Sequence, residues 1–165
     1  MPATVAPPPS LAEVAREAES LGKASHPKGD RPDFAYGTAG FRTAAEGLDH
    51  VMFRMGILAA IRSKALGGQA VGVMVTASHN PVQDNGAKLV EPMGEMLPLE
   101  WEAHATKIAN VSDDGLAAAI AEIIGAVGAN PAAHAEVVVG RDSRPSSPGL
   151  ALAVCDGVEV LCPAS

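Results

Sequence analysis

One turn-rich loop of the sequence brings together several side chains that can do chemistry. It reads TASHNPVQDNGAK, from Thr76 to Lys88, and follows the apolar run VGVMV. A hydroxyl, an imidazole, an amide and an ammonium group stand within it, those of Ser78, His79, Asn80 and Lys88. In open α/β sheets, ligands gather outside the carboxyl ends of strands. The loop is therefore the first candidate for a functional site.

Two further polar segments add arginines to the candidate site. YGTAGFR, from Tyr36 to Arg42, ends in an arginine, and GRDSRPSS, which follows another apolar run, carries Arg141 and Arg144. A serine hydroxyl is a poor nucleophile by itself, whereas guanidinium and ammonium groups stabilise a transferring phosphoryl group. The cations near Ser78 therefore predict a phosphoserine.

The residues also allow other interpretations. A serine hydrolase would need a G-x-S-x-G elbow, but Ala77 and His79 flank the serine in place of glycines. The histidine is equally compatible with a structural hydrogen bond inside the loop. Arg144 can pair with Asp142 at the surface, where such a pair contributes little to stability. Lys88, taken alone, would be an ordinary solvated strand residue.

Helices and strands must position these loops. Ser10 is a candidate N-cap for a helix that ends at Gly22, and the Gly- and Pro-rich segment 23–47 predicts irregular structure. A helix is expected from about Ala44 to Leu66, since apolar residues recur at helical spacing along it. Those residues are Leu48, Met52, Met55 and Ala59. Further helices are expected with Pro98 in the first turn, from Ser112 to about Val127, and over 148–155.

Short apolar runs rich in valine predict the strands of a sheet. They cover 71–76, 87–91, 136–140 and 158–161. Strands that alternate with helices predict an α/β fold, here a mixed sheet of about four strands flanked by helices. The last of these strands has no helix after it, so we expect a fragment in which the final strand is truncated.

Composition excludes several classes of protein. A net charge of -7 leaves no basic face for nucleic acid. The longest apolar segment, which contains Glu122, is shorter than the ~20 residues of a membrane-spanning helix.

Residues 1–9 are rich in proline and predict a disordered leader before a single domain, 10–165. The two cysteines, Cys155 and Cys162, lack the spacing of a metal site and suit the reduced thiols of a cytoplasmic protein.

Taken together, the motifs resemble those of the α-D-phosphohexomutase superfamily. The active-site serine loop of that family reads T-A-S-H-N-P, as at 76–81, and DNGAK, YGTAGFR and GRDSR match as well. In the phosphoglucomutase and phosphomannomutase branches, the G-R-D-x-R loop precedes the serine loop, whereas here it follows. That order, with EPMGEML at 91–97, resembles the phosphoacetylglucosamine mutase branch. The matching motifs bracket most of the chain, from Tyr36 to Leu161.

The resemblance implies a reaction and a role for each candidate residue. Ser78 would carry the phosphoryl group that passes to an N-acetylglucosamine phosphate. The resulting bisphosphate would turn over and return its other phosphate, which interconverts the 6-phosphate and the 1-phosphate for UDP-N-acetylglucosamine synthesis. The other roles are phosphate contact or proton transfer for Arg42, Lys88 and His79, and support of the phosphate pocket for Asn80, Arg141 and Arg144.

The same resemblance implies Mg²⁺ and a sugar bisphosphate primer of the glucosamine type. A phosphate oxygen on Ser78 would be one metal ligand, but the family's D-x-D-x-D-R metal loop and its sugar-recognition loop are absent from this sequence. Family members have four domains, and the resemblance covers only the first. We therefore expect this fragment alone to be inactive, with the remaining domains as its partners. Two alternatives remain, a non-catalytic folding or partner-binding module and a related phosphohexomutase that acts on another sugar.

Overall fold

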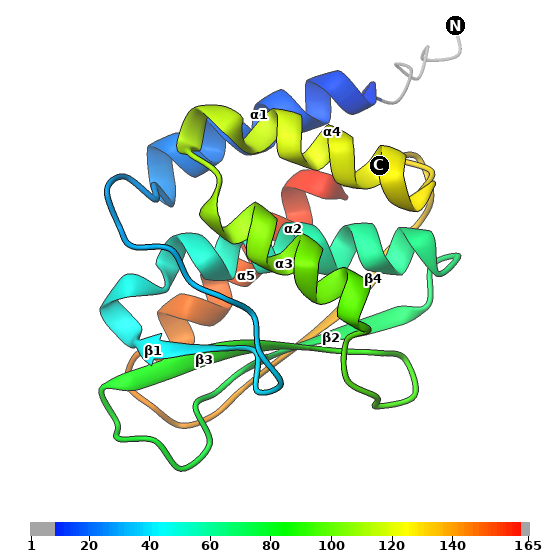
Figure 1. The fold of residues 1–165 in the computed structure, drawn as a ribbon. Helices are drawn as coiled ribbons and strands as arrows, with labels where there is room; N and C mark the ends of the chain where they lie inside the picture. The colour runs from blue at the N-terminus through cyan, green and yellow to red at the C-terminus, as the bar shows by residue number, and fades with distance from the viewer. Residues whose placement is uncertain (1–8, 163–165) are drawn as a thin grey trace, which may run out of the picture.

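The fold is a four-stranded mixed sheet with five α-helices on one face (Figure 1). The computed structural model describes residues 9–162, so the predicted leader lies outside the described residues except for Pro9. The strands are β1 (Phe41–Ala44), β2 (Ala70–Val75), β3 (Asp84–Val90) and β4 (Glu136–Arg141), in the order β1-β3-β2-β4. β2 and β4 run parallel, and β3 is antiparallel to β1 and β2. The predicted α/β class with a mixed sheet is confirmed.

The helices begin and end close to the predicted positions in most cases. They are α1 (Leu11–Ser25), α2 (Asp49–Ala65), α3 (Leu99–Asn110), α4 (Leu116–Val127) and α5 (Ser147–Leu161), with short 3₁₀ helices at Ala45–Gly47 and Asp113–Gly115. Ser10 caps α1 through a reciprocal capping box with Glu13. The helix continues past Gly22, however, because that glycine lies against the ring of Phe53 and serves packing instead of ending the helix.

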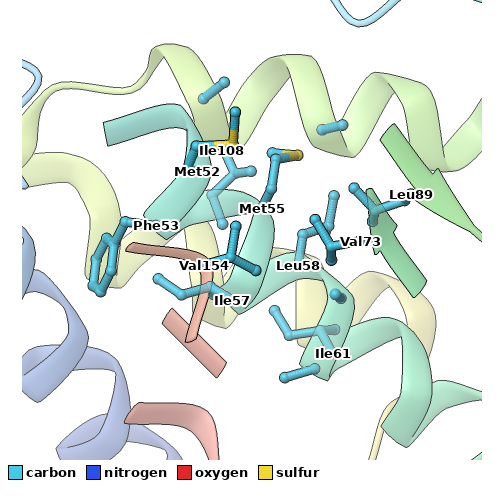
Figure 2. Packing of buried hydrophobic residues seen from close by; sticks show 14 of the residues in the cluster. Met52, Phe53, Met55, Ile57, Leu58, Ile61, Val73, Leu89, Ile108 and Val154 are labelled. Carbon is cyan, nitrogen blue, oxygen red and sulfur yellow. The ribbon is translucent and has the colours of Figure 1, made fainter. Parts of the chain in front are cut away.

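Helix α2 forms the centre of the core. Its side chains are buried on nearly all sides, because the sheet, α3 and α5 pack around it (Figure 1). Figure 2 shows Met55 and Leu58 of α2 among apolar side chains from the sheet, α3 and α5. A helix buried all round has no single apolar stripe. The predicted apolar face of this helix is therefore buried, but it is only part of the buried surface.

The predicted strand at 158–161 is wrong, because these residues complete helix α5. Buried positions along α5 recur at helical spacing: Leu150, Ala153, Val154, Gly157, Val160 and Leu161. Two glycines let α5 and α2 approach backbone to backbone. A Cβ on Gly157 would lie 1.9 Å from the carbonyl oxygen of Phe53, and one on Gly56 would lie 2.1 Å from that of Val154. Gly157 therefore lies inside α5 and serves its contact with α2.

The fourth strand of the sheet is β1, inside the segment predicted to be irregular. It pairs with β3 in the register Phe41↔Ala87 and Arg42↔Gly86. Glycine makes this pairing possible, since a Cβ on Gly86 would lie 2.3 Å from the carbonyl oxygen of Phe41. A strand this short carries no alternating pattern long enough to be recognised from sequence.

One face of the sheet lies under the helices and the other is open. Along β2, Val73 and Val75 are buried beneath the helices, while Met74 between them is 44% exposed on the opposite face. Val138 of the neighbouring strand β4 is 58% exposed and pairs with Gly72, which lies on the same open face as Met74. No helix within residues 9–162 has the length and apolar character needed to cross a membrane.

Candidate functional site

The serine loop leaves β2 at its carboxyl end and returns as β3. Ser78 is exposed in this loop. Among residues 9–162, it is the one non-glycine residue with a positive φ, at 53°. A side chain in this left-handed region costs of the order of 1–3 kcal/mol and persists where the surrounding contacts fix it. The loop therefore holds Ser78 in a defined and unusual conformation.

Hydrogen bonds hold the backbone of Ser78 at both its N–H and its carbonyl oxygen. Its N–H donates to Oγ1 of Thr76 over 3.1 Å, and its carbonyl oxygen accepts from Nη2 of Arg144 over 2.8 Å. The hydroxyl of Thr76 donates in turn to Oδ2 of Asp142 over 2.8 Å. Oδ2 also accepts from Nε of Arg144 over 2.8 Å. One carboxylate therefore anchors both residues that hold the serine.

Arg144 binds the inside of the loop with its whole guanidinium group. Besides Asp142 and the carbonyl of Ser78, it donates to the carbonyl oxygens of Asn80, Pro81 and Asp84. Each guanidinium N–H thus has an acceptor within the loop or on Asp142. Arg144 does pair with Asp142, as one interpretation of the sequence held, and this pair also holds the loop. Any support that Arg144 gives to a phosphate pocket would act through the loop backbone.

The carboxylate of Asp142 stays ionised because of its hydrogen bonds. Partial burial by itself would raise its pKa, but the hydroxyls of Ser147 and Thr76 and the backbone and side chain of Arg144 outweigh burial and lower the pKa well below its usual range. Ser147 makes the shortest of these bonds, 2.6 Å to Oδ1. An ionised Asp142 is thus available as an anchor throughout the physiological pH range.

Arg42 and Lys88 supply positive charge on the open face of the sheet. Arg42 pairs with Gly86, which is two residues from Lys88, so both side chains lie on the face that the helices leave uncovered. Nη1 of Arg42 donates to Oδ1 of Asn80 over 3.5 Å, and the amide of Asn80 donates to Asp84 over 3.0 Å. Arg42 is therefore tied to the serine loop through Asn80. The buried Nε of Arg42 has no hydrogen-bond partner among the described residues.

His79 lies beside the serine hydroxyl. Its Nδ1 is 3.4 Å from Oγ of Ser78, and both side chains belong to exposed residues. Which of the two atoms donates depends on the tautomer of the ring. The imidazole is close enough to exchange a proton with the hydroxyl after a small adjustment.

The structure does not bring Arg141 to the serine. Ser78, Asn80 and Arg144 line an open depression of about 350 Å³, together with Val82, Asp142 and Ser143. Arg141 pairs with Val75, whose side chain faces the helices, and it lines a different depression of about 330 Å³ between β4 and α5. Support of the phosphate pocket by Arg141 stays a prediction, and this arrangement does not favour it.

Of four residues that hold the site, Asp142 was considered from the sequence only as a surface partner of Arg144, and Thr76, Asn85 and Ser147 were not singled out. Asn85 is fully buried, donates to the hydroxyls of Ser146 and Ser147, and accepts from the N–H of Gly86. All four stand inside the motifs TASHNP, DNGAK and GRDSRPSS. Their position in polar loops at strand ends could have pointed to these residues. Sequence spacing does not show, however, which polar residues bind one another.

The described residues do not by themselves form a magnesium site. Within residues 9–162, no three His, Cys, Asp or Glu side chains gather as metal ligands. The carboxylates nearest the serine, those of Asp84 and Asp142, accept hydrogen bonds from Asn80, Thr76 and Arg144. Mg²⁺ takes about six oxygen ligands, and beyond a phosphate on Ser78 this loop offers too few free oxygens to hold it.

Comparison with known proteins agrees with this architecture. Residues 43–115 match the family profile described as phosphoglucomutase/phosphomannomutase, alpha/beta/alpha domain I. The chain is 56% identical over 138 residues to phosphoacetylglucosamine mutase of Sus scrofa, and 54% identical over 138 residues to that of Homo sapiens. These matches cover 84% of this chain but 25% of either relative. The chain therefore spans about a quarter of the length of these relatives.

Solved structures show the same fold. The apo-form of an N-acetylglucosamine-phosphate mutase superposes with a TM-score of 0.85 at 46% identity, covering 89% of this chain and 32% of that one. The Aspergillus fumigatus enzyme in complex with GlcNAc-6P and magnesium superposes with a TM-score of 0.80 at 42% identity, covering 96% and 28%. A variant of that enzyme, in complex with glucose 1,6-bisphosphate, gives a TM-score of 0.82 at 41% identity, covering 94% and 28%.

Proposed function

Because the chain belongs to the α-D-phosphohexomutase superfamily, we propose that it forms the phosphoserine-bearing domain of a phosphoacetylglucosamine mutase. The complete enzyme interconverts N-acetylglucosamine 6-phosphate and 1-phosphate through a sugar bisphosphate. Its product supplies UDP-N-acetylglucosamine synthesis in the cytoplasm. The identity of the chain to the pig and human enzymes supports this choice of sugar over those of other phosphohexomutases.

One observation supports the proposal above all others, the fixed left-handed conformation of Ser78. It projects an exposed hydroxyl from a loop in which the carbonyl oxygens of Ser78, Asn80, Pro81 and Asp84 accept hydrogen bonds from Arg144. Arg42, linked to the loop through Asn80, shares the open face of the sheet with Lys88. A phosphate on Ser78 would thus project from the loop at the side where these cations lie, a combination that suits phosphoryl transfer.

Each residue has a defined part in the transfer. A hydroxyl oxygen of the sugar phosphate attacks phosphorus, the bond from phosphorus to Oγ of Ser78 breaks, and a new phosphate ester forms. The sugar hydroxyl loses its proton, and Oγ gains one, for which His79 is the nearest exchangeable group. Arg42 and Lys88 stabilise the charge on the phosphoryl oxygens. The reverse of this step, with the other phosphate of the bisphosphate, restores the phosphoserine.

Magnesium and the sugar are bound with the help of protein beyond these 165 residues. In such an enzyme, a phosphate oxygen on Ser78 would be one Mg²⁺ ligand, and carboxylates of another domain would be the others. Bound Mg²⁺ supplies additional charge stabilisation to the phosphoryl group. The related Aspergillus fumigatus enzyme has been solved with GlcNAc-6P and magnesium, and a variant of it with glucose 1,6-bisphosphate. A bisphosphate of this kind serves as the primer that first phosphorylates Ser78.

A chimeric enzyme tests the proposal. It joins this chain, in place of the matching quarter, to the rest of the Sus scrofa enzyme. We expect it to convert N-acetylglucosamine 6-phosphate into the 1-phosphate, as ³¹P NMR detects, when Mg²⁺ and glucose 1,6-bisphosphate are present. Ser78→Ala should lower the rate by at least about a thousandfold. Ser143→Ala, a change of the same kind in the same depression, should leave most activity intact.

Two outcomes contradict the proposal. One is a folded chimera without turnover above background. The other is a chimera in which Ser78→Ala is as active as the parent.

The open face of the sheet favours a second role for the same domain. Met74 and Val138 leave apolar surface there that no described element covers. A partner-binding module without catalysis would bury this surface against another protein. If the chimera is inactive but the chain still binds the isolated remainder of the Sus scrofa enzyme, in a manner that Met74→Lys abolishes, this second role replaces the first.

A further inference from the structure

We propose that Asp142 is a positioning residue for phosphoryl transfer, which holds the backbone of Ser78 in its left-handed conformation through Thr76 on one side and Arg144 on the other. The proposal rests on the proposed function for its catalytic consequence. Its structural part concerns the described residues alone. Asp142 itself lies in the loop after β4, 64 residues beyond Ser78 in the sequence.

The first arm of the anchor acts on the amide side of the serine. The N–H of Ser78 needs an acceptor that is fixed in space, and Oγ1 of Thr76 provides it at 3.1 Å. A threonine hydroxyl rotates freely unless its own proton is committed. The hydroxyl of Thr76 donates a hydrogen bond to Oδ2 of Asp142, with 2.8 Å between the two oxygens. This bond turns the lone pairs of Oγ1 toward the N–H of Ser78. The carboxylate thereby orients an acceptor that it does not itself supply.

The second arm acts on the carbonyl side. Nε of Arg144 donates to Oδ2 of Asp142 at 2.8 Å, and the N–H of Arg144 donates to Oδ1 at 3.1 Å. The bond from Nε orients the guanidinium group, and the bond from the backbone N–H fixes the position of the residue, so that Nη2 meets the carbonyl oxygens of Ser78 and Asn80. A planar, rigid fork suits this task better than a lysine ammonium group. The peptide groups on both sides of the serine side chain thus depend on one carboxylate.

Asp142 is itself held from three directions. Its N–H donates to the carbonyl of Val75 at the end of β2. Its Oδ1 accepts from the hydroxyl of Ser147, a fully buried residue at the start of α5. That hydroxyl also accepts from Asn85 in β3, so the anchor is tied to β2, β3 and α5 at once. Since these elements form the core, the position of Ser78 is set by the rigid part of the fold.

The consequence for catalysis follows from geometry. If the anchor is lost, Ser78 can relax toward ordinary negative φ, which turns its side chain in a new direction. A misplacement of about 1 Å at a reacting group can cost a hundredfold in rate. Because binding of the sugar phosphate depends mainly on other residues, loss of the Asp142 anchor should lower kcat and change KM much less.

The test uses Asp142→Asn, which keeps the size of the side chain and removes its charge. In NMR spectra of the 165-residue chain, we expect the Cα and Cβ shifts of Ser78 to leave the values of a left-handed residue. The Ser78 amide should exchange with solvent about tenfold faster. Asp33→Asn, the same change at an exposed carboxylate that pairs with the largely buried Lys28, is the control and should alter neither signal.

A second pair of variants keeps the test decisive if Asp142→Asn does not fold. Thr76→Ser retains the hydroxyl and should preserve the shifts and the exchange rate of Ser78, whereas Thr76→Val removes the hydroxyl and should change both. A merely structural role for the threonine would make the two variants alike. Left-handed shifts and slow exchange at Ser78 in both Thr76→Val and Asp142→Asn would overturn the proposal.

The catalytic part is measured in the chimera. We expect Asp142→Asn to lower kcat about a hundredfold while KM stays within about threefold, and Thr76→Ser to keep most of the activity. An unchanged kcat in Asp142→Asn would overturn the positioning role. An inactive parent chimera would instead contradict the proposed function, and the NMR measurements on Ser78 would still decide whether Asp142 is its anchor.

Discussion

His50 should make the unfolding free energy fall as the pH is lowered from neutral. Its ring is fully buried in α2, and neither ring nitrogen has a hydrogen-bond partner among the described residues. Burial lowers its pKa from 6.5 to about 4, and the cations of Arg54, Arg31 and Lys28 add to the effect. The unfolded chain takes up a proton near pH 6.5, while the folded chain resists protonation until about pH 4. The contribution of the neutral His50 ring to the unfolding free energy is therefore fully present above pH 6.5 and is lost as the pH falls to about 4.

The size of the loss follows from the two pKa values. Their separation corresponds to about 3 kcal/mol of unfolding free energy. Carboxyl groups titrate in part of the same range, so the wild type must be compared with His50→Leu, which removes the buried titrating group. The unfolding free energy of the wild type relative to that of His50→Leu should fall by about 3 kcal/mol between about pH 7 and about pH 4.

Urea unfolding followed by circular dichroism measures this difference. His134→Leu removes a histidine from an exposed position and serves as the matched control. If the wild type and His50→Leu lose stability in parallel over this pH range, then His50 is not the buried neutral imidazole that the structure describes.

Three further changes test the packing and the site. Gly157→Ala places a methyl group against a carbonyl of α2 and should cost about 1–3 kcal/mol in urea unfolding, whereas Gly149→Ala on the same helix meets no neighbour within 4 Å and should be neutral or stabilising. Gly86→Ala should lower the melting temperature by separating β1 from β3, while Gly37→Ala, which also has open space around it, should not. Lys88→Met in the chimera should lower kcat/KM about a hundredfold with no loss of thermal stability, and an unchanged kcat/KM would remove this lysine from the site.

The serine loop could be predicted from sequence as a candidate site because its own residues are nearly contiguous. Ser78, His79 and Asn80 follow one another in a loop after a valine-rich strand, and strand ends are where α/β sheets bind ligands. The cations were found as residue types. The face on which each one lies was not, because the side of a sheet depends on register, and a shift of one residue reverses it. Arg42 and Lys88 share the open face, while Arg141 lines a depression beside α5.

The wrong predictions of helices and strands also arose because local sequence does not show contacts between distant segments. Four apolar or acidic residues at 158–161 read equally well as a short strand or as a helix turn, and their contact with α2 decides for the helix. Gly22 looks like a helix end, but it lies inside α1, against the ring of Phe53. Strand β1 owes its pairing to Gly86, a contact between segments far apart in the sequence. The strand propensity of a short segment does not predict such long-range contacts.

Phosphate mapping on the chimera tests the central claim most directly. After incubation with glucose 1,6-bisphosphate and Mg²⁺, the protein is digested and its phosphopeptides are sequenced by mass spectrometry. Phosphate is expected on Ser78 and should be lost in Ser78→Ala. Phosphate on Ser143 or Ser146 with Ser78 unmodified would contradict it.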